Sequence, residues 1–403
     1  MLIYLTDKAL EPGISIYTRS DLVRCLGNIL QAHIEAKHLV IANIQTLAAY
    51  HQVEEIKELS ETSKVALKSI SREFIQNGRQ LRQDISGYVQ IVEPSQPEIT
   101  ITTQNQQTIV NIPIWYFEDS EASQKTILLC ENQNDAKLFI HLVKAYITTL
   151  KAFKKVPFKI QATPRGGGGN TIKPELDVQC QSRTFCLCIV DNDCSAPGIA
   201  FGGSAKRLGL SQQKWQEWQN SSVQQPDGSI TIQKYSALAK TFALKVREVE
   251  NLIPTELIEN SLKSTEKETI EKIDSLKKWE KRCPKEWRKF IDLKNGLRGY
   301  DVLHWTDKEA QKCWLDFMQG IGKESLKLKN DCQEGNECND KKRCHCILWV
   351  GLGENILSQV VEYMDNETPH KIAEYFNFAE ETSLNELADE LLVWCCAGER
   401  IRV

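Results

Sequence analysis

The stretch RTFCLCIVDND spans Arg183–Asp193 and decides the fold class. Phe185–Val190 is an apolar run that is too short for the core of a helix and ends abruptly at Asp191. Such a run is typical of a strand buried on both faces inside a parallel sheet. Side chains two positions apart on a strand point the same way, so the carboxylates of Asp191 and Asp193 should converge. Two neighbouring carboxylates suit a divalent ion that prefers oxygen ligands, such as Mg²⁺ or Mn²⁺.

A second apolar run upstream, Thr126–Cys130 (TILLC), repeats this design because it is followed by Glu131. Asn134 and Asp135 offer an N-cap and a first-turn acid for a helix that we expect over residues 136–152. Ligands of open α/β sheets bind beyond the carboxyl ends of the strands. The acid after this strand and the two aspartates should therefore meet at one edge of the sheet.

The two strands are separated by Phe158–Thr163 and a loop that contains Gly166–Gly169. The loop lacks the G-x-x-x-x-G-K-[ST] pattern of a phosphate-binding loop, so a nucleotide pocket is the less favoured interpretation. We favour a loop beside the site, whose backbone N–H groups and Arg165 approach the phosphate of a nucleic acid.

The order strand, helix, strand, glycine loop, helix and strand, with acids at two strand tips, resembles the TOPRIM domain of certain topoisomerases, primases and nucleases. Downstream, Val246–Pro254 (VREVENLIP) contains a Glu–Asn pair, with Glu250 as the matching acid and Glu248 beside it. A Glu–Asn pair at this place is similar to the OLD-like and DUF4435-like nucleases of bacterial anti-phage defence. The resemblance covers residues 124–259.

This resemblance implies a Rossmann-like core with a mostly parallel sheet. The catalytic residues that it implies are Glu131, Asp191, Asp193, Glu250 and, more loosely, the downstream basic residue Lys294, which would stabilise phosphate. The implied ligands of Mg²⁺ or Mn²⁺ are Glu131, Asp135, Asp191, Asp193, Glu248 and Glu250. Asn132 stands where the family usually has glycine, and this departure favours an alternative, a catalytically degenerate binding or regulatory subunit.

Positive charge accumulates over residues 263–298, interleaved with Trp279 and Trp287. Basic residues with nearby aromatic rings suit contact with a nucleic-acid backbone. Interspersed glutamates leave a solvated amphipathic helix as an equally weighted alternative. The predicted nucleic-acid contacts are Arg165, Lys281, Arg282, Arg288, Lys289 and Arg298.

A cysteine-rich loop, DCQEGNECNDKKRCHC, follows near the C-terminal end. Its four thiols could complete a tetrahedral structural zinc site, with His345 as a substitute ligand, against the alternative of free cysteines on a loop. The four predicted ligands are Cys332, Cys338, Cys344 and Cys346.

The 403 residues allow two or three domains, and 41% hydrophobic with 26% charged residues is ordinary for a soluble protein. The net charge of −4 gives no overall attraction to nucleic acid, so binding would need local basic surface or bound metal. No signal peptide or membrane span is recognisable, so we expect a cytoplasmic protein whose 14 cysteines are reduced thiols.

Three regions are expected: an accessory domain over residues 1–122, mainly helical with short strands; a TOPRIM-like catalytic domain over 123–260; and a C-terminal helical region over 261–403. Helical spacing of apolar residues between 29 and 70 predicts a helical hairpin, capped at Ser20, and residues 98–110 alternate like a β-hairpin. Helices are also expected around Trp215 and Trp218, before the Glu–Asn pair, and over 355–364 and 384–394.

These observations favour a metal-dependent nuclease that acts on DNA or RNA, including transfer RNA. Topoisomerase and primase activities are less favoured, because no further module of either kind is recognisable. The chain contains no recognisable ATPase, and OLD-like nucleases carry or recruit one. The resemblance therefore implies a partner subunit with ATPase or sensor activity, and it leaves homodimerisation open.

Overall fold

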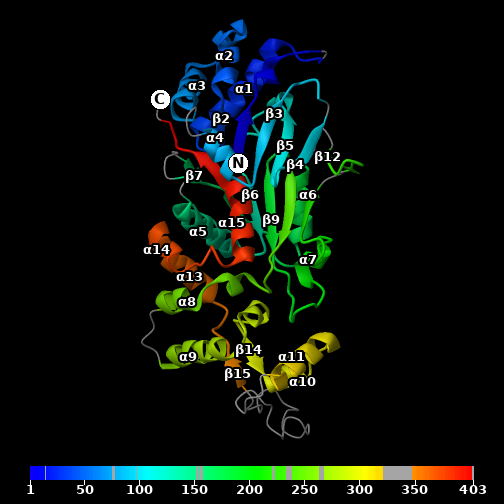
Figure 1. Cartoon of the computed structure of the whole chain (residues 1–403), viewed down its shortest axis with the longest axis vertical. Coiled ribbons are helices and arrows are strands. Elements are labelled where there is room, and N and C mark those ends of the chain that lie inside the picture. The colour runs from blue at the N-terminus through cyan, green and yellow to red at the C-terminus, as the bar shows by residue number, and fades with distance from the viewer. Residues whose placement is uncertain are drawn as a thin grey trace.

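The computed structural model describes residues 1–13, 15–74, 78–96, 98–150, 153, 158–219, 223–232, 238–262, 267–320 and 347–401. The molecule is elongated, with a seven-stranded sheet and its helices at one end and a five-stranded sheet in the middle (Figure 1). A segment drawn in yellow and orange lies at the other end. The predicted α/β class with a mostly parallel sheet is confirmed.

The five-stranded sheet is built around the stretch Arg183–Asp193, which contains its central strand. Its strands, in the order in which they pair, are β10 (Gln216–Gln219), β13 (Ala239–Ala243), β9 (Cys186–Val190), β6 (Ile127–Cys130) and β8 (Thr163–Gly166). The four strands from β13 to β8 are mutually parallel, and β10 is antiparallel to β13. Val190 pairs with Ala243 and Cys130 pairs with Gly166, so the carboxyl ends of these strands lie at one edge.

Both faces of this sheet are covered, which explains why β9 and β13 are buried along their whole length. Leu187 and Ile189 of β9 join a core that includes α5 (Gln133–Thr149). Cys186, Cys188 and Val190 pack on the other side with residues of α6 (Ile172–Cys180) and α7 (Gly203–Arg207). The prediction that this strand is buried on both faces is therefore confirmed.

The N-terminal region contains strands where we expected a helical hairpin. Leu39 and Ile41 lie in β2 (Leu39–Ala42), which pairs in parallel with β1 (Leu2–Leu5), so the predicted hairpin is wrong at this point. The helical spacing of these apolar residues was misleading because a strand buried on both faces is apolar throughout. The other apolar positions do lie in helices, namely α1 (Arg19–Ile34), α2 (Ile44–His51) and α3 (Glu61–Phe74). The strands of this sheet, in pairing order, are β11 (Val223–Gln224), β12 (Ile230–Ile232), β4 (Ile99–Gln104), β5 (Gln107–Pro113), β3 (Gly87–Val92), β1 (Leu2–Leu5) and β2 (Leu39–Ala42).

The predicted β-hairpin is confirmed as β4 and β5. Its two linking residues, Asn105 and Gln106, have φ of 49° and 66°, as the tight turns of hairpins require. The first long helix is capped by Thr18 and Asp21, so of the expected pair Ser20–Asp21 only Asp21 takes part in the cap. The helices of this region are η1 (Asp7–Leu10), α1 (Arg19–Ile34), α2 (Ile44–His51), η2 (Glu54–Glu58), α3 (Glu61–Phe74), α4 (Gly78–Asp84) and η3 (Ile114–Phe117).

The segment between β9 and β13 connects the two sheets. β10 pairs with β13 in the five-stranded sheet, whereas β12 pairs with β4 in the seven-stranded sheet. The helix expected around Trp215 and Trp218 is wrong, because Trp218 lies in β10. Both rings pack on the core, Trp215 edge-on against Phe242 and Trp218 beside Trp394. The preferred interpretation, that these rings cover the sheet, agrees with this packing.

Part of the C-terminal region forms a small unit with its own core. The rings of Trp279, Trp314 and Trp349 meet there, and Trp287 stacks on Phe317. Its elements are α9 (Lys267–Arg282), η6 (Lys285–Phe290), β14 (Gly296–Arg298), α10 (Gly299–Leu303), α11 (Lys308–Gly320) and β15 (Ile347–Val350). The cysteine-rich loop with Cys332, Cys338, Cys344 and Cys346 lies outside the described residues, so the zinc site stays a prediction.

The last helices return to the five-stranded sheet, where α13, α14 and α15 pack on α5, and α13 also packs on α8. The helices expected over 355–364 and 384–394 are confirmed. These elements are α8 (Thr255–Leu262), α13 (Ile356–Asp365), α14 (Pro369–Ala373) and α15 (Thr382–Cys395). The boundary expected between residues 260 and 261 falls inside α8, whose buried residues belong to the same core.

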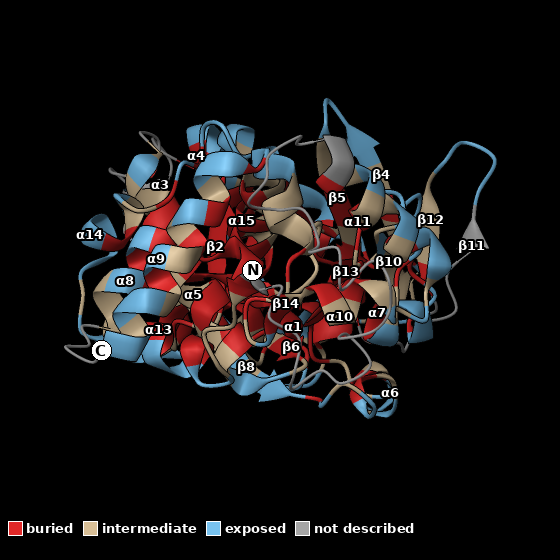
Figure 2. Cartoon of the chain, turned by 90° about the horizontal axis from the view of Figure 1, so that it is seen from below, coloured by how far each residue is buried: buried red, intermediate tan, exposed pale blue. Residues whose placement is uncertain are grey.

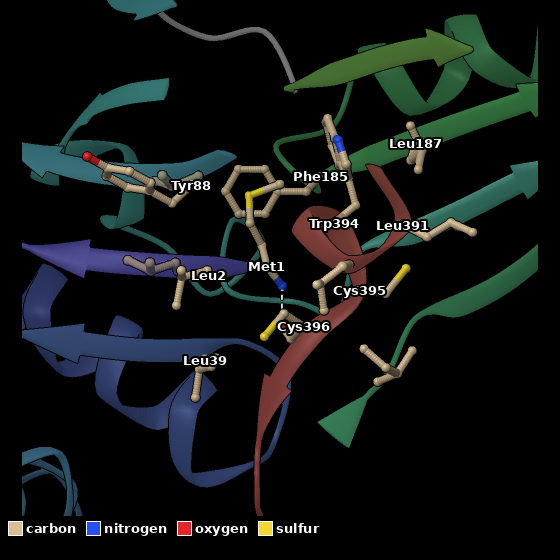
Figure 3. Close-up of a cluster of buried hydrophobic side chains, with 14 of the residues drawn as sticks. Met1, Leu2, Leu39, Tyr88, Phe185, Leu187, Leu391, Trp394, Cys395 and Cys396 are labelled. Carbon is tan, nitrogen blue, oxygen red and sulfur yellow. Dashed lines mark hydrogen bonds between the residues drawn. The ribbon is translucent and has the colours of Figure 1, made fainter. Parts of the chain in front are cut away.

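One core joins residues from both ends of the chain. β16 (Cys396–Gly398) pairs with β7 (Phe158–Ile160), and the Met1 amine donates a hydrogen bond to the Cys396 carbonyl. Figure 3 shows Met1 and Phe185 lying together next to α15. Figure 2 shows buried residues in the interior and exposed residues along the outer helices. The seven-stranded sheet, the five-stranded sheet and the C-terminal helices therefore pack as one body.

Candidate active site at the strand ends

The acids predicted from the sequence lie beyond the carboxyl ends of three adjoining parallel strands. Glu131 follows β6, and Asp191 follows β9 directly. Glu248 and Glu250 come after β13, at the start of the short helix η5 (Val249–Leu252). A strand, not the expected helix, therefore leads to the Glu–Asn pair. This correction places the two glutamates at the same edge of the sheet as the other acids.

Glu131 lies against the glycine loop that follows β8. Gly168 donates a backbone hydrogen bond to the Glu131 carbonyl, and a Cβ added at Gly169 would lie 3.0 Å from Glu131 Oε2. Oε1 of this carboxylate is buried and has no hydrogen-bond partner. Burial and the charge of Asp193 raise the pKa of Glu131 above its usual value. The carboxylate is thus held close to the loop with one oxygen available to a ligand.

The extended conformation of β9 ends before Asp193, whereas the predicted convergence of Asp191 and Asp193 requires it to continue. Asp193 is exposed and has a φ of 53°, in the left-handed region. Its N–H donates to the Arg247 carbonyl at 3.0 Å, and the buried Asn192 side chain donates to the Leu244 carbonyl at 2.9 Å. These bonds tie the end of β9 to the segment after β13. The reason for placing Asp191 and Asp193 on one face of a strand was therefore wrong.

Asp191 lies among the other acids. Burial, followed by the charges of Glu131, Asp135, Glu250 and Glu248, raises the pKa of Asp191 well above its usual value. The carboxylates repel one another most strongly when all are ionised. This edge of the sheet therefore favours any bound positive charge.

Gly203 leaves the space that the Asp193 side chain occupies. Gly203 has a φ of 39°, and a methyl group added there would overlap Asp193 Oδ2. Gly198 also has a positive φ, 79°, but an added methyl group would meet nothing within 4 Å. We expect both alanine variants to lose about 1 kcal/mol of stability because of the left-handed backbone. Gly203→Ala should in addition displace the Asp193 carboxylate.

Chemical denaturation and cleavage assays of the two variants test this expectation. Gly198→Ala serves as the matched control, since it carries the same backbone strain without the overlap. Cleavage that falls in Gly203→Ala and stays unchanged in Gly198→Ala is the expected result. Equal cleavage by both variants would show that the position of Asp193 is unimportant.

The two glutamates after β13 are held in different ways. Glu248 caps η5 together with Asn251, and burial, followed by the charge of Asp292, raises the pKa of Glu248 to about 7. The Glu250 side chain is only 2% exposed, and its Oε2 has no hydrogen-bond partner. Buried polar atoms normally have partners, so this oxygen is a candidate ligand atom.

Asp135 occupies the first turn of α5, where it accepts a hydrogen bond from the Asn132 N–H at 2.8 Å. Asn132, not the expected Asn134, is the N-cap, and its own side chain accepts from the Asn134 N–H. Burial, followed by the charges of Glu250 and Glu131, raises the pKa of Asp135 to about 7. Asn132 has a φ of −124°, which any residue adopts, so the backbone here does not need glycine.

Lys294 is a basic residue that contacts two of these acids. Its Nζ lies 3.1 Å from Glu250 Oε1 and 3.8 Å from Glu248 Oε2. Burial alone would lower the pKa of Lys294, but the charges of Glu250 and Glu248 outweigh it and raise the pKa above its usual value. The sequence predicted this residue only loosely, and the structure places it in contact with two predicted metal ligands.

The carboxylates suit a hard divalent cation by their chemistry, and Glu131 Oε1, Glu248 Oε2 and Glu250 Oε2 are buried without hydrogen-bond partners. Their present arrangement is not a complete coordination shell. Within the described residues, no group of three or more His, Cys, Asp or Glu side chains could hold a metal ion as it stands. A bound ion would therefore require these side chains to adjust.

The predicted nucleic-acid contacts are dispersed. Arg288 has a structural role, since its side chain pairs with Glu280 at 2.7 Å and donates to the Ile253 carbonyl at 2.6 Å. Arg165 pairs with Glu175 at 2.6 Å beside the glycine loop. The remaining predicted contacts lie in α9 (Lys281 and Arg282), η6 (Lys289) and β14 (Arg298). Trp279 is buried, so this tryptophan serves the core and not base stacking.

The structure adds three residues that the sequence did not single out. Ser204 and Arg207 both donate to the Gly169 carbonyl and so fix the glycine loop beside Glu131. Arg247 bridges Glu248 and Asp292, with Nε–Oε1 and NH2–Oδ2 distances of 3.4 and 3.5 Å. Arg247 adjoins the Glu–Asn motif, but nothing in the spacing distinguishes it from other basic residues. These contacts depend on the folded arrangement.

No protein-family model, curated protein or solved structure matches the chain. The resemblance to TOPRIM proteins therefore rests on the motif residues alone. Among the described helices, none combines the length and the apolar character needed to cross a bilayer.

Proposed function

We propose that the chain is a metal-dependent nuclease that hydrolyses phosphodiester bonds in DNA or RNA, including transfer RNA. The observation that supports this proposal most is the meeting of acids at three adjoining strand ends, with buried carboxylate oxygens that lack hydrogen-bond partners. Structural carboxylates are normally satisfied, so such oxygens favour a site that binds a ligand. The resemblance to OLD-like nucleases supports a role as an effector of bacterial anti-phage defence.

The residues proposed to hold the cation are Glu131, Asp191, Asp193 and Glu250, with Asp135 and Glu248 close by. Mg²⁺ or Mn²⁺ would supply orientation of the attacking water and neutralisation of charge on the phosphate. Glu248, with a pKa of about 7, has a carboxylate able to accept a proton near neutral pH. Lys294 supplies positive charge beside it.

The test is cleavage of plasmid DNA and of total RNA by the wild type and by Glu131→Gln. We expect activity with Mg²⁺ or Mn²⁺ and none in chelator. Ca²⁺ tolerates irregular geometry and should bind without turnover. Glu131→Gln should abolish cleavage, because it keeps the shape of the side chain and removes its charge. Cleavage that persists in Glu131→Gln or in chelator would contradict the proposal.

A second candidate is a binding or regulatory subunit without turnover. The ion pair between Lys294 and Glu250 favours it, as does the lack of three converging metal ligands among the described residues. The cleavage assay separates the two candidates, since a degenerate subunit would cut neither substrate under any metal condition.

We propose further that activity is controlled by an ATPase or sensor subunit, as the resemblance implies. An open nuclease site would damage the host's own nucleic acid unless something restrained it. Expression of the chain without this subunit is therefore expected to arrest growth in a manner that depends on Asp191, and co-expression with the subunit should relieve the arrest. Harmless expression of the chain alone, with no bound protein encoded beside it, would contradict this control.

A further inference from the structure

Lys294 lies where a metal-binding acid cluster would hold its cation. The ammonium group contacts Glu250 and Glu248, which approach it from the segment after β13. Lys294 comes from a different part of the chain, the loop between η6 and β14. Its side chain is 26% exposed, whereas that of Glu250 is 2% exposed. The lysine therefore reaches from the protein surface into a buried pair of carboxylates.

The backbone on both sides of this contact is firmly held. Asn251, next to Glu250, donates to the carbonyls of Arg288 and Ile291, both at 2.9 Å. The Lys294 carbonyl accepts from the Gly353 N–H at 3.0 Å, and a methyl group added at Gly351 would overlap that carbonyl. The backbone of Lys294 is thus fixed relative to the two glutamates. Its four-carbon stem is the part that is free to move.

The lysine does not satisfy the acids completely. One ammonium group offsets one charge, whereas Glu248, Glu250 and the neighbouring Asp191 carry more than one when ionised. Oε2 of Glu250 and Oε2 of Glu248 remain buried without a hydrogen bond. A purely structural ion pair in a buried place would be expected to engage these lone pairs. The cluster therefore retains capacity for a second or a stronger cation.

We infer that Lys294 is a tethered cation that offsets part of the charge of Glu248 and Glu250 in the metal-free protein and competes with a divalent ion for them. The inference rests on the proposed function, since it concerns the same site. A divalent ion that binds Glu250 displaces the ammonium group. The displaced group is then available to the phosphate of a substrate.

The first test measures Mn²⁺ binding by calorimetry to the wild type, Lys294→Met and Lys289→Met. Lys289 is a matched control because it lies five residues away and pairs with Glu286 on the surface. Lys294→Met should bind Mn²⁺ about tenfold more tightly than the wild type, since it removes the competitor. Lys289→Met should bind like the wild type. Lys294→Met should also unfold at a lower temperature in chelator and regain stability with Mn²⁺.

The second test uses the unaltered chain and therefore does not depend on the folding of a variant. Acetic anhydride modifies free amines, and mass spectrometry reports the rate at each lysine. Mn²⁺ should accelerate modification of Lys294 and leave that of Lys289 unchanged. An unchanged rate at Lys294 in a protein that binds Mn²⁺ would overturn the inference.

The outcomes distinguish failure of the inference from failure of the proposed function. Equal or weaker Mn²⁺ binding by Lys294→Met would overturn the inference while the metal site stands. No Mn²⁺ binding by any of the proteins would overturn the inference and the proposed function together.

Discussion

Asp191→Asn is expected to abolish nucleic-acid cleavage and to leave the metal-free protein at least as stable as the wild type. Asp191 lies at the end of β9, within the influence of four other carboxylates. Loss of a carboxylate that holds the cation should lower the cleavage rate by about three orders of magnitude or more. The amide has nearly the same shape, so the packing of the strand end is preserved.

The stability part of this expectation follows from the sign of the pKa shift. A raised pKa means that the surroundings disfavour the ionised Asp191 carboxylate. Removing the charge relieves that repulsion, whereas most substitutions of a buried residue destabilise. Asp177→Asn on α6 is the control, because this exposed acid pairs with Lys173 away from the site. Normal cleavage by Asp191→Asn, or a large loss of its stability, would show that Asp191 has only a structural role.

The metal-free protein is expected to lose stability as the pH rises from about 4 to about 7. Asp135 and Glu248 have folded-state pKa values of about 7, above their ordinary values of 3.8 and 4.5. The folded state therefore binds more protons than the unfolded state within this window, and its free energy of unfolding falls through it. Between pH 5 and 7.5 the loss from these two groups should be on the order of 5 kcal/mol. Lys294 remains charged throughout, so it does not alter the sign.

Urea denaturation in chelator at pH 5 and pH 7.5 measures this loss. The double variant Asp135→Asn with Glu248→Gln should have a flatter dependence, because two of the acids with raised pKa values are gone. Mg²⁺ or Mn²⁺ at pH 7.5 should restore stability to the wild type by binding the folded state alone. Wild-type protein that is equally stable at both pH values without metal would contradict the assigned pKa shifts.

Local sequence patterns predicted the part of the fold on which the candidate site depends. β9 and β6 followed from short apolar runs that end in acids, and their parallel pairing places Glu131 and Asp191 at one edge. The patterns failed where a tertiary contact decides the outcome. Leu39 has helical spacing from its neighbours but pairs with Leu2 in a strand. Asp193 was expected to continue an extended strand, yet its backbone turns to bond the Arg247 carbonyl.

The site residues likewise fall into two groups: those predicted from contiguous sequence and those whose role depends on contacts between distant segments. The acids at strand ends can be predicted because a strand and the residue that follows it are contiguous. The contact of Lys294 with Glu250 joins segments 44 residues apart, and its only signal was a basic residue somewhere downstream. The support of the glycine loop by Ser204 and Arg207 had no recognisable pattern. Spacing along the chain does not encode such contacts.

The pairing of β16 with β7, together with the packing of α15 on α5, has a consequence for synthesis on the ribosome. The face of α5 that α15 covers stays exposed until α15 (Thr382–Cys395) has left the exit tunnel. Contacts between such distant segments also make the final folding step slow, since they close large loops. The acids of the candidate site are made before α15, so their scaffold closes only after α15 has emerged. Nascent chains that still lack α15 therefore expose this apolar face, and this is where we expect a chaperone to bind.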